Sequence, residues 1–169
     1  MVASAGALEA AGLEVVRFNF GYRERGSRLP DRMPRLIEEF TAVAEKVRSG
    51  RKLLIGGRSM GGRVASMMAA EGFACDGLLL LAYPLHPAGK PDKLRDAHLP
   101  KIRVPVLCFN GTRDELCRRD LMDKALATVK TGWTMCWVDG ADHSLKSKRA
   151  LDEITVRTRE WIQKGREAP

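Results

Sequence analysis

One stretch near the middle of the chain, residues 52–70, constrains the fold more than any other. It contains the apolar run Leu53-Leu54-Ile55, then Gly57-Arg58-Ser59-Met60-Gly61, and then a segment of small and unbranched residues. The apolar run is typical of a strand that is buried on both faces, as in a parallel sheet. The pentapeptide fits the G-x-S-x-G pattern, in which the chain turns sharply from a strand into a helix and exposes a serine hydroxyl at the sheet edge.

The pentapeptide alone is a weak signal, because most chance occurrences of G-x-S-x-G are ordinary turns. The strand before it and the helix after it provide the context that a nucleophile elbow requires. We expect Gly57 and Gly61 to be needed because side chains at these positions would collide with the neighbouring strand and helix. Gly62 and Ala65 would let the helix approach the sheet closely.

The rest of the chain alternates between strand-like and helix-like segments. Strands are expected at 14–20, 53–55, 77–83, 104–110 and 133–138, and helices at 2–11, 34–50, 60–70, 121–129 and 151–162. Residues 94–99 form either a short helix or an irregular excursion. This alternation predicts an α/β three-layer sandwich with a mostly parallel sheet of about five strands. We expect one domain, residues 1–169.

The composition of the chain limits the kinds of partner that we expect it to bind. The chain has no apolar run near the roughly 20 residues that span a bilayer, so no membrane contact is expected. A formal charge of +8, much of it from arginines within 23–35, raises the question of nucleic acid. No zinc-finger spacing, RNA-binding motif or interleaving of aromatic and basic residues accompanies these arginines. A solvated arginine-rich surface is therefore the favoured interpretation, and nucleic acid is not an expected partner.

The four cysteines show neither C-x-x-C pairing nor the spacing of metal ligands. We therefore expect no metal and no cofactor. A reduced, cytoplasmic setting fits such cysteines best. The first residues contain no basic segment followed by a long apolar core, so no secretory signal is expected either.

Three predicted strand ends carry the side chains that a nucleophilic hydrolase needs. Ser59 follows the strand at 53–55, Asp114 follows the strand at 104–110, and His143 follows the strand at 133–138. Because the carboxyl ends of parallel strands meet at one edge of a sheet, we expect these residues to lie together.

The chemistry explains why these three residue types belong together. A serine hydroxyl is a poor nucleophile until a base removes its proton, and imidazole titrates near neutral pH. A carboxylate on the second ring nitrogen fixes the tautomer and stabilises the imidazolium. Asp139 and Asp142 flank His143 and compete for the acid role. Asp114 is preferred because its strand should neighbour the nucleophile's side of the sheet.

Four short segments, 56–63, 83–87, 98–100 and 111–114, carry a resemblance to a known family. With them the chain resembles the α/β-hydrolase superfamily, whose members place serine, acid and histidine in this order. It is most similar to a group of small proteins often compared with dienelactone hydrolases. That group includes a testis-expressed vertebrate protein and a subunit of the nonspecific lethal chromatin-modifying complex. Dienelactone hydrolases carry cysteine at the elbow, so serine here indicates esterase-like chemistry.

The resemblance implies roles for further residues. The backbone amide of Met60 would be one donor of an oxyanion hole. Arg58 and His86 are candidates for lining the substrate pocket. For His86, a structural role in the proline-rich loop at 84–91 is the favoured alternative.

The resemblance also implies that a family strand and its oxyanion loop, which would precede the first helix, are missing. That strand would lie between the strand at 14–20 and the elbow strand. We therefore expect these two strands to pair directly or to leave a gap that invites a homodimer. The missing loop would supply the second oxyanion donor, whose loss slows such reactions about 10²–10³-fold.

The sequence thus predicts a serine hydrolase of the esterase or thioesterase type that acts on a small acyl substrate. Ser59, Asp114 and His143 would be its catalytic residues. The alternative is a hydrolase-fold scaffold that binds a protein partner without catalysis.

Overall fold

The structure is a computed structural model that describes residues 2–48 and 50–167. Met1, Ser49, Ala168 and Pro169, which the predicted domain includes, lie outside the described residues. The helices are α1 (Val2–Ala10), α2 (Gly21–Glu24), α3 (Met33–Val47), α4 (Met60–Ala70), α5 (Arg119–Leu126) and α6 (Lys148–Glu167), with a 3₁₀ turn at Leu99–Lys101. The strands are β1 (Leu54–Arg58), β2 (Gly77–Leu81), β3 (Val106–Gly111) and β4 (Trp133–Val138).

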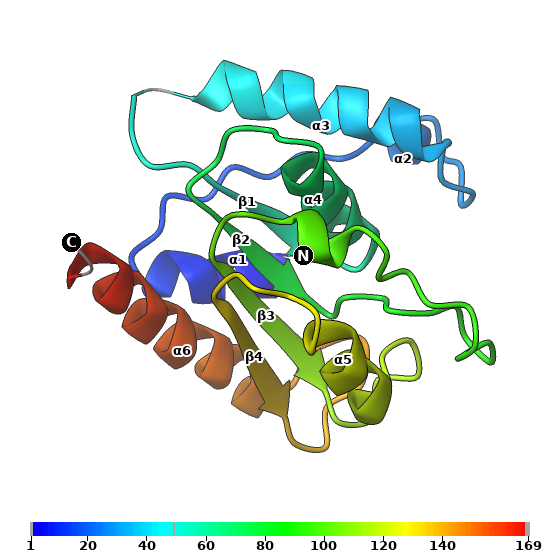
Figure 1. Cartoon of the computed structure of the whole chain (residues 1–169). Helices are drawn as coiled ribbons and strands as arrows, with labels where there is room; N and C mark the ends of the chain where they lie inside the picture. The colour runs from blue at the N-terminus through cyan, green and yellow to red at the C-terminus, as the bar shows by residue number, and fades with distance from the viewer. Residues whose placement is uncertain (1, 49, 168–169) are drawn as a thin grey trace.

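The strands form one parallel sheet in the order β1-β2-β3-β4, with helices on both faces (Figure 1). One hydrophobic core joins α3, α4 and α5 to one face of the sheet. The other core joins α1 and α6 to the opposite face. The predicted three-layer α/β architecture is therefore confirmed.

The leucine run of β2 supplies both cores. Leu78 and Leu80 belong to the core under α4, and Leu79 and Leu81 to the core under α6. Successive side chains of a strand point to opposite faces, so a strand between two helical layers must be apolar at every position. All five residues of β2 are buried. The continuous apolar run in the sequence has this physical cause.

The strand predicted at 14–20 is wrong. Within the described chain this segment has no regular secondary structure and pairs with no strand, so the sheet has four strands instead of about five. The rings of Phe18 and Phe20 pack against Phe40 of α3, with centroid separations of 5.0 and 6.3 Å. Packing on a helix therefore accounts for two of the apolar positions that suggested a strand, Phe18 and Phe20, whereas Val16 is exposed.

A groove of about 1420 Å³ is lined both by residues 12–20 and by β1. The two segments consequently do not pair directly, which was one of the two expected arrangements. β1 lies at the edge of the sheet and is largely half-buried, in contrast to the fully buried β2 and β3. Of the residues 94–99, those at 94–98 form an irregular excursion, and Leu99 begins the 3₁₀ turn.

The close approach of α4 to β1 depends on particular glycines. A Cβ atom on Gly62 would lie 2.7 Å from the carbonyl oxygen of Gly57, and one on Gly57 would lie 3.0 Å from the backbone of Gly61. A Cβ atom on Gly61 would meet no described atom within 4 Å. The expected collision is thus confirmed for Gly57 and wrong for Gly61, because the Gly61 Cβ position is directed into open space.

Polar contacts hold the long connection between β2 and β3 onto α4. The Ser66 hydroxyl donates to the carbonyl of Arg63, and the Nε2 of His98 lies 2.8 Å from the Ser66 oxygen. The Tyr83 hydroxyl donates to the carbonyl of Arg95 at 2.9 Å. Burial, reinforced by the charge of Arg63, lowers the pKa of His98 to about 4.

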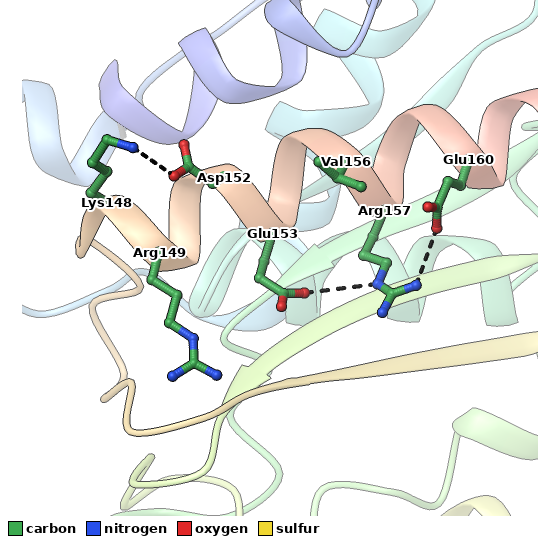
Figure 2. Close-up of a pocket in the computed structure, with 7 residues that line it drawn as sticks. All are labelled: Lys148, Arg149, Asp152, Glu153, Val156, Arg157 and Glu160. Atoms are coloured by element: carbon green, nitrogen blue, oxygen red, sulfur yellow. Dashed lines mark hydrogen bonds and ion pairs between the residues drawn. The ribbon is translucent and has the colours of Figure 1, made fainter.

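Charged side chains pair along the exposed helix surfaces. Figure 2 shows the outer face of α6, where Lys148 pairs with Asp152, and Arg157 pairs with Glu153 and Glu160. A depression of about 570 Å³ lies over these residues. Spacings of three and four residues put such pairs on one side of a helix, where they are solvated and individually weak. None of the described helices has the length and apolar character needed to cross a membrane.

We predict that Gly62→Ala lowers the free energy of unfolding by about 1–3 kcal/mol, because the added methyl group overlaps a backbone oxygen. Gly61→Ala is the matched control in the same helical turn. There the methyl group has room, and replacing a helical glycine raises stability by up to about 1 kcal/mol. Urea denaturation of the three proteins measures the difference. Equal effects of the two substitutions would contradict the close approach at Gly62.

We predict that His98 makes the fold sensitive to acid. Its pKa is lowered from 6.5 to about 4 in the fold, so between these values the unfolded chain binds the extra proton more readily. The neutral ring contributes to the free energy of unfolding at pH values above its pKa in the unfolded chain. This contribution is lost as the pH falls toward the lower pKa of the ring in the fold. Wild type should therefore lose more unfolding free energy between neutral pH and pH 4 than His98→Gln. Parallel pH dependence of the two proteins would refute this.

Candidate active site

Ser59 occupies the turn between β1 and α4 in a strained conformation. Its φ is 52° and its ψ is −115°, a region that residues with a side chain rarely adopt. The Ser59 amide donates to the carbonyl of Leu81 at 2.8 Å, which ties the turn to the end of β2. The turn thus has the strained geometry of a nucleophile elbow, with the serine at the carboxyl edge of the sheet.

The loop after β4 brings His143 to this serine. His143 Nε2 lies 2.8 Å from the Ser59 hydroxyl oxygen, and Nδ1 lies 2.9 and 3.0 Å from the two carboxylate oxygens of Asp114. A proton on Nδ1 is donated to the carboxylate, which leaves the Nε2 lone pair free to accept the serine proton. This tautomer is inferred from the hydrogen-bond partners.

Asp114 is held on the turn after β3, and its side chain is completely buried. Besides the His143 ring, its carboxylate accepts hydrogen bonds from the amide of Leu116 at 2.9 Å and from Asn110 Nδ2 at 3.0 Å. Three donors therefore converge on one carboxylate, which restricts its rotation and satisfies its charge away from water.

Asn110 is a site residue that the sequence reasoning missed. It is 0 % exposed, and its amide also bonds to the backbone nitrogen and oxygen of Tyr83, both at 3.1 Å. A signal was available, because an asparagine within an apolar buried strand needs hydrogen-bond partners for its amide. Asn110 links the end of β2 to the carboxylate of Asp114.

The two competing carboxylates have other partners. Asp142 accepts hydrogen bonds from the amide and hydroxyl of Ser144, at 2.8 and 2.6 Å, and these bonds lower the pKa of its carboxyl group. Asp139 lies 3.5 Å from the guanidinium of Arg149. Of the three candidates, Asp114 is the one hydrogen-bonded to His143 within the described chain.

Of the remaining predicted site residues, Met60 and Arg58 adjoin Ser59 in the chain, whereas His86 has other partners. Met60 is the first residue of α4, where amides have no acceptor within the helix and point out of its N-terminus. Arg58 lies beside the His143 loop, with Nη1 donating to the carbonyl of Ser144 at 2.9 Å. His86 is buried, and both its ring nitrogens bond to backbone groups, Nδ1–H to Pro87 O and Nε2 from the amide of Arg118. These bonds are those of a residue that stabilises its loop.

Backbone strain gathers at this edge of the sheet. Ala82 directly follows β2 with φ 50°, and Leu145 follows His143 by two residues with φ 47°. Both are buried. Such conformations persist only where the surrounding structure holds them, and they are frequent at functional sites. No cluster of three or more metal-ligating side chains occurs among residues 2–48 and 50–167.

Comparison with solved structures supports this fold. An alpha-beta serine hydrolase homologue from Coxiella burnetii superposes with a TM-score of 0.76 at 21% identity, over 95% of this chain and 74% of that one. The esterase domain of a Rhodothermus marinus protein gives a TM-score of 0.72 at 16% identity, over 96% and 79%. A serine hydrolase without a lid from Xanthomonas campestris is 26% identical, with a TM-score of 0.68 over 99% and 73%.

The family described as the alpha/beta hydrolase domain matches residues 1–164, nearly the whole chain. The parallel sheet, the strained serine turn and the order of strand-end residues agree with that match. The chain therefore belongs to the alpha/beta hydrolase domain family.

Proposed function

We propose that the protein is a serine hydrolase that cleaves an ester or thioester of a small acyl substrate. One observation carries the proposal, namely the continuous hydrogen-bond chain from Ser59 through His143 to Asp114. Its distances of 2.8 and 2.9 Å lie in the range that proton transfer requires. Similarity to serine hydrolases and to an esterase domain supports the choice of acyl transfer.

In the proposed reaction the Ser59 oxygen attacks the carbonyl carbon of the substrate while its proton moves to His143 Nε2. The Met60 amide, at the positive end of α4, faces the developing oxyanion. Asp114 stabilises the imidazolium, which then protonates the departing alkoxide or thiolate. A water molecule, deprotonated by His143, attacks the acyl-enzyme and releases the acid, and Ser59 regains its proton.

We predict that a fluorophosphonate probe labels wild-type protein at one residue, Ser59, and that Ser59→Ala is not labelled. His143→Gln and Asp114→Asn should still fold but react far more slowly. For Asp114→Asn a loss of about 10⁴-fold is expected, because the amide favours the wrong tautomer of His143. Labelling rates, with mass spectrometry of the modified peptide, provide the measurement.

Asp139→Asn is the matched control for this experiment. It removes a carboxylate of the same loop that is 75% exposed and forms no hydrogen bond or ion pair with His143 among the described residues. Its labelling rate should equal that of wild type. A folded wild-type protein that is not labelled would contradict the proposed catalytic role of Ser59. Slow labelling of Asp139→Asn would indicate that Asp139, and not Asp114, is the acid.

We propose protein binding through the edge of β1 as a second candidate function, with a homodimer as its simplest form. β1 pairs with β2 alone in the described chain and runs along the groove of about 1420 Å³. The amide of Ser59 bonds to Leu81 and the carbonyl of Leu53 to Asp76, so the odd-numbered residues face β2. In a parallel strand the alternate residues Leu54, Gly56 and Arg58 then direct their backbone groups outward.

We predict that wild type forms a dimer in sedimentation equilibrium and that Leu54→Pro weakens it, because proline removes one outward N–H group. Edge strands tolerate proline at such positions. Leu54→Ala, which keeps the N–H, is the matched control, and Ser59→Ala should dimerise like wild type. A monomer at all accessible concentrations would eliminate the homodimer.

A further inference from the structure

We infer that Arg58 is a positioning residue, which holds the loop carrying His143 against the strand carrying Ser59. The inference rests on the proposed function. Arg58 directly precedes Ser59, and Ser144 directly follows His143. The bond from Arg58 Nη1 to the Ser144 carbonyl, 2.9 Å long and partly buried, therefore joins the nearest neighbours of the nucleophile and the base.

The topology makes such a bond necessary. His143 follows β4, and Ser59 follows β1, the two strands at opposite edges of the sheet. Across this span, two hydrogen bonds join residues 56–61 to residues 139–147 within the described chain, Ser59 to His143 and Arg58 to Ser144. The first involves the proton that the proposed reaction transfers, so it cannot hold the geometry throughout a turnover. The second involves no reacting atom.

The opposite side of the same loop is already fixed. The Arg113 amide donates to the carbonyl of Ala141 at 2.9 Å, and the Gly140 amide donates to the Thr112 hydroxyl at 2.8 Å. These bonds attach the loop to the end of β3, the strand that also leads to Asp114. They fix the position of His143 relative to Asp114. The distance between His143 and Ser59 then depends on the bond made by Arg58.

Arginine suits this task chemically. Its guanidinium is planar and permanently charged, and a charged donor makes a stronger bond to a carbonyl than a neutral one. A misplacement of about 1 Å can cost about 10²-fold in rate even when the altered residue does not touch the substrate. Loss of the Arg58 bond should therefore slow the chemical step without weakening substrate binding.

The test compares wild type with Arg58→Met, which keeps an unbranched stem like the methylene chain of arginine and removes every donor. We expect kcat for p-nitrophenyl acetate and the rate of fluorophosphonate labelling each to fall about 10²-fold, with KM unchanged. Lys146→Met is the matched control. It removes an equal charge near the same loop, from a side chain with no hydrogen bond or ion pair among the described residues. It should behave like wild type.

Chemical rescue separates positioning from a general effect on folding or charge. Methylguanidinium should restore part of the kcat of Arg58→Ala, and methylammonium, which carries the same charge without the planar fork, should restore less. The inference is overturned if Arg58→Met reacts like wild type, if it raises KM with kcat unchanged, or if both cations rescue equally. A folded wild type that does not react overturns the proposed function and this inference together, whereas the other outcomes leave the proposed function standing.

Discussion

The close packing of α4 on β1 is the constraint on which the site depends. Gly57 and Gly62 are in such proximity that neither position has room for a side chain, and the chain between them must reverse within a few residues. This reversal forces Ser59 into its positive φ and aims the N-terminus of α4 at the same point. Strain at one residue is tolerated because the surrounding strand and helix are held by their own cores. The serine is thus presented by rigid elements and not by a mobile loop.

Around this turn, the hydrogen-bond partners form successive layers. His143 contacts the serine, Asp114 contacts the histidine, and Asn110 contacts the aspartate. Exposure decreases along the series, since the His143 side chain is 24% exposed and the Asp114 side chain 0%. A buried polar network of this kind is stable only when every member is satisfied, and each bond then supports the next. The bonds that position the more exposed side chains of the site therefore begin in the buried interior of the sheet.

Much of this arrangement could be predicted from the sequence, because it depends on local patterns. Apolar runs located β1 to β4, and helical spacing located α3 to α6. The positions after three strands indicated that Ser59, Asp114 and His143 would lie together, as they do. The strand at 14–20 could not be predicted correctly, since a strand exists only if a neighbour pairs with it, and pairing is not local. The bonds of Asn110 and Arg58 were also out of reach. They join segments 27 and 86 residues apart, and loop geometry alone decides whether such side chains meet.

Tyr83 forms hydrogen bonds in two directions. Its hydroxyl holds the carbonyl of Arg95 in the connection between β2 and β3, while its backbone nitrogen and oxygen hold the amide of Asn110. One residue is thus the shared anchor of an exposed excursion and of the buried carboxylate. The residue that contacts the excursion is therefore also the residue that holds Asn110 beside Asp114. Tyr83 is thus one link between the outer loop and the interior of the site.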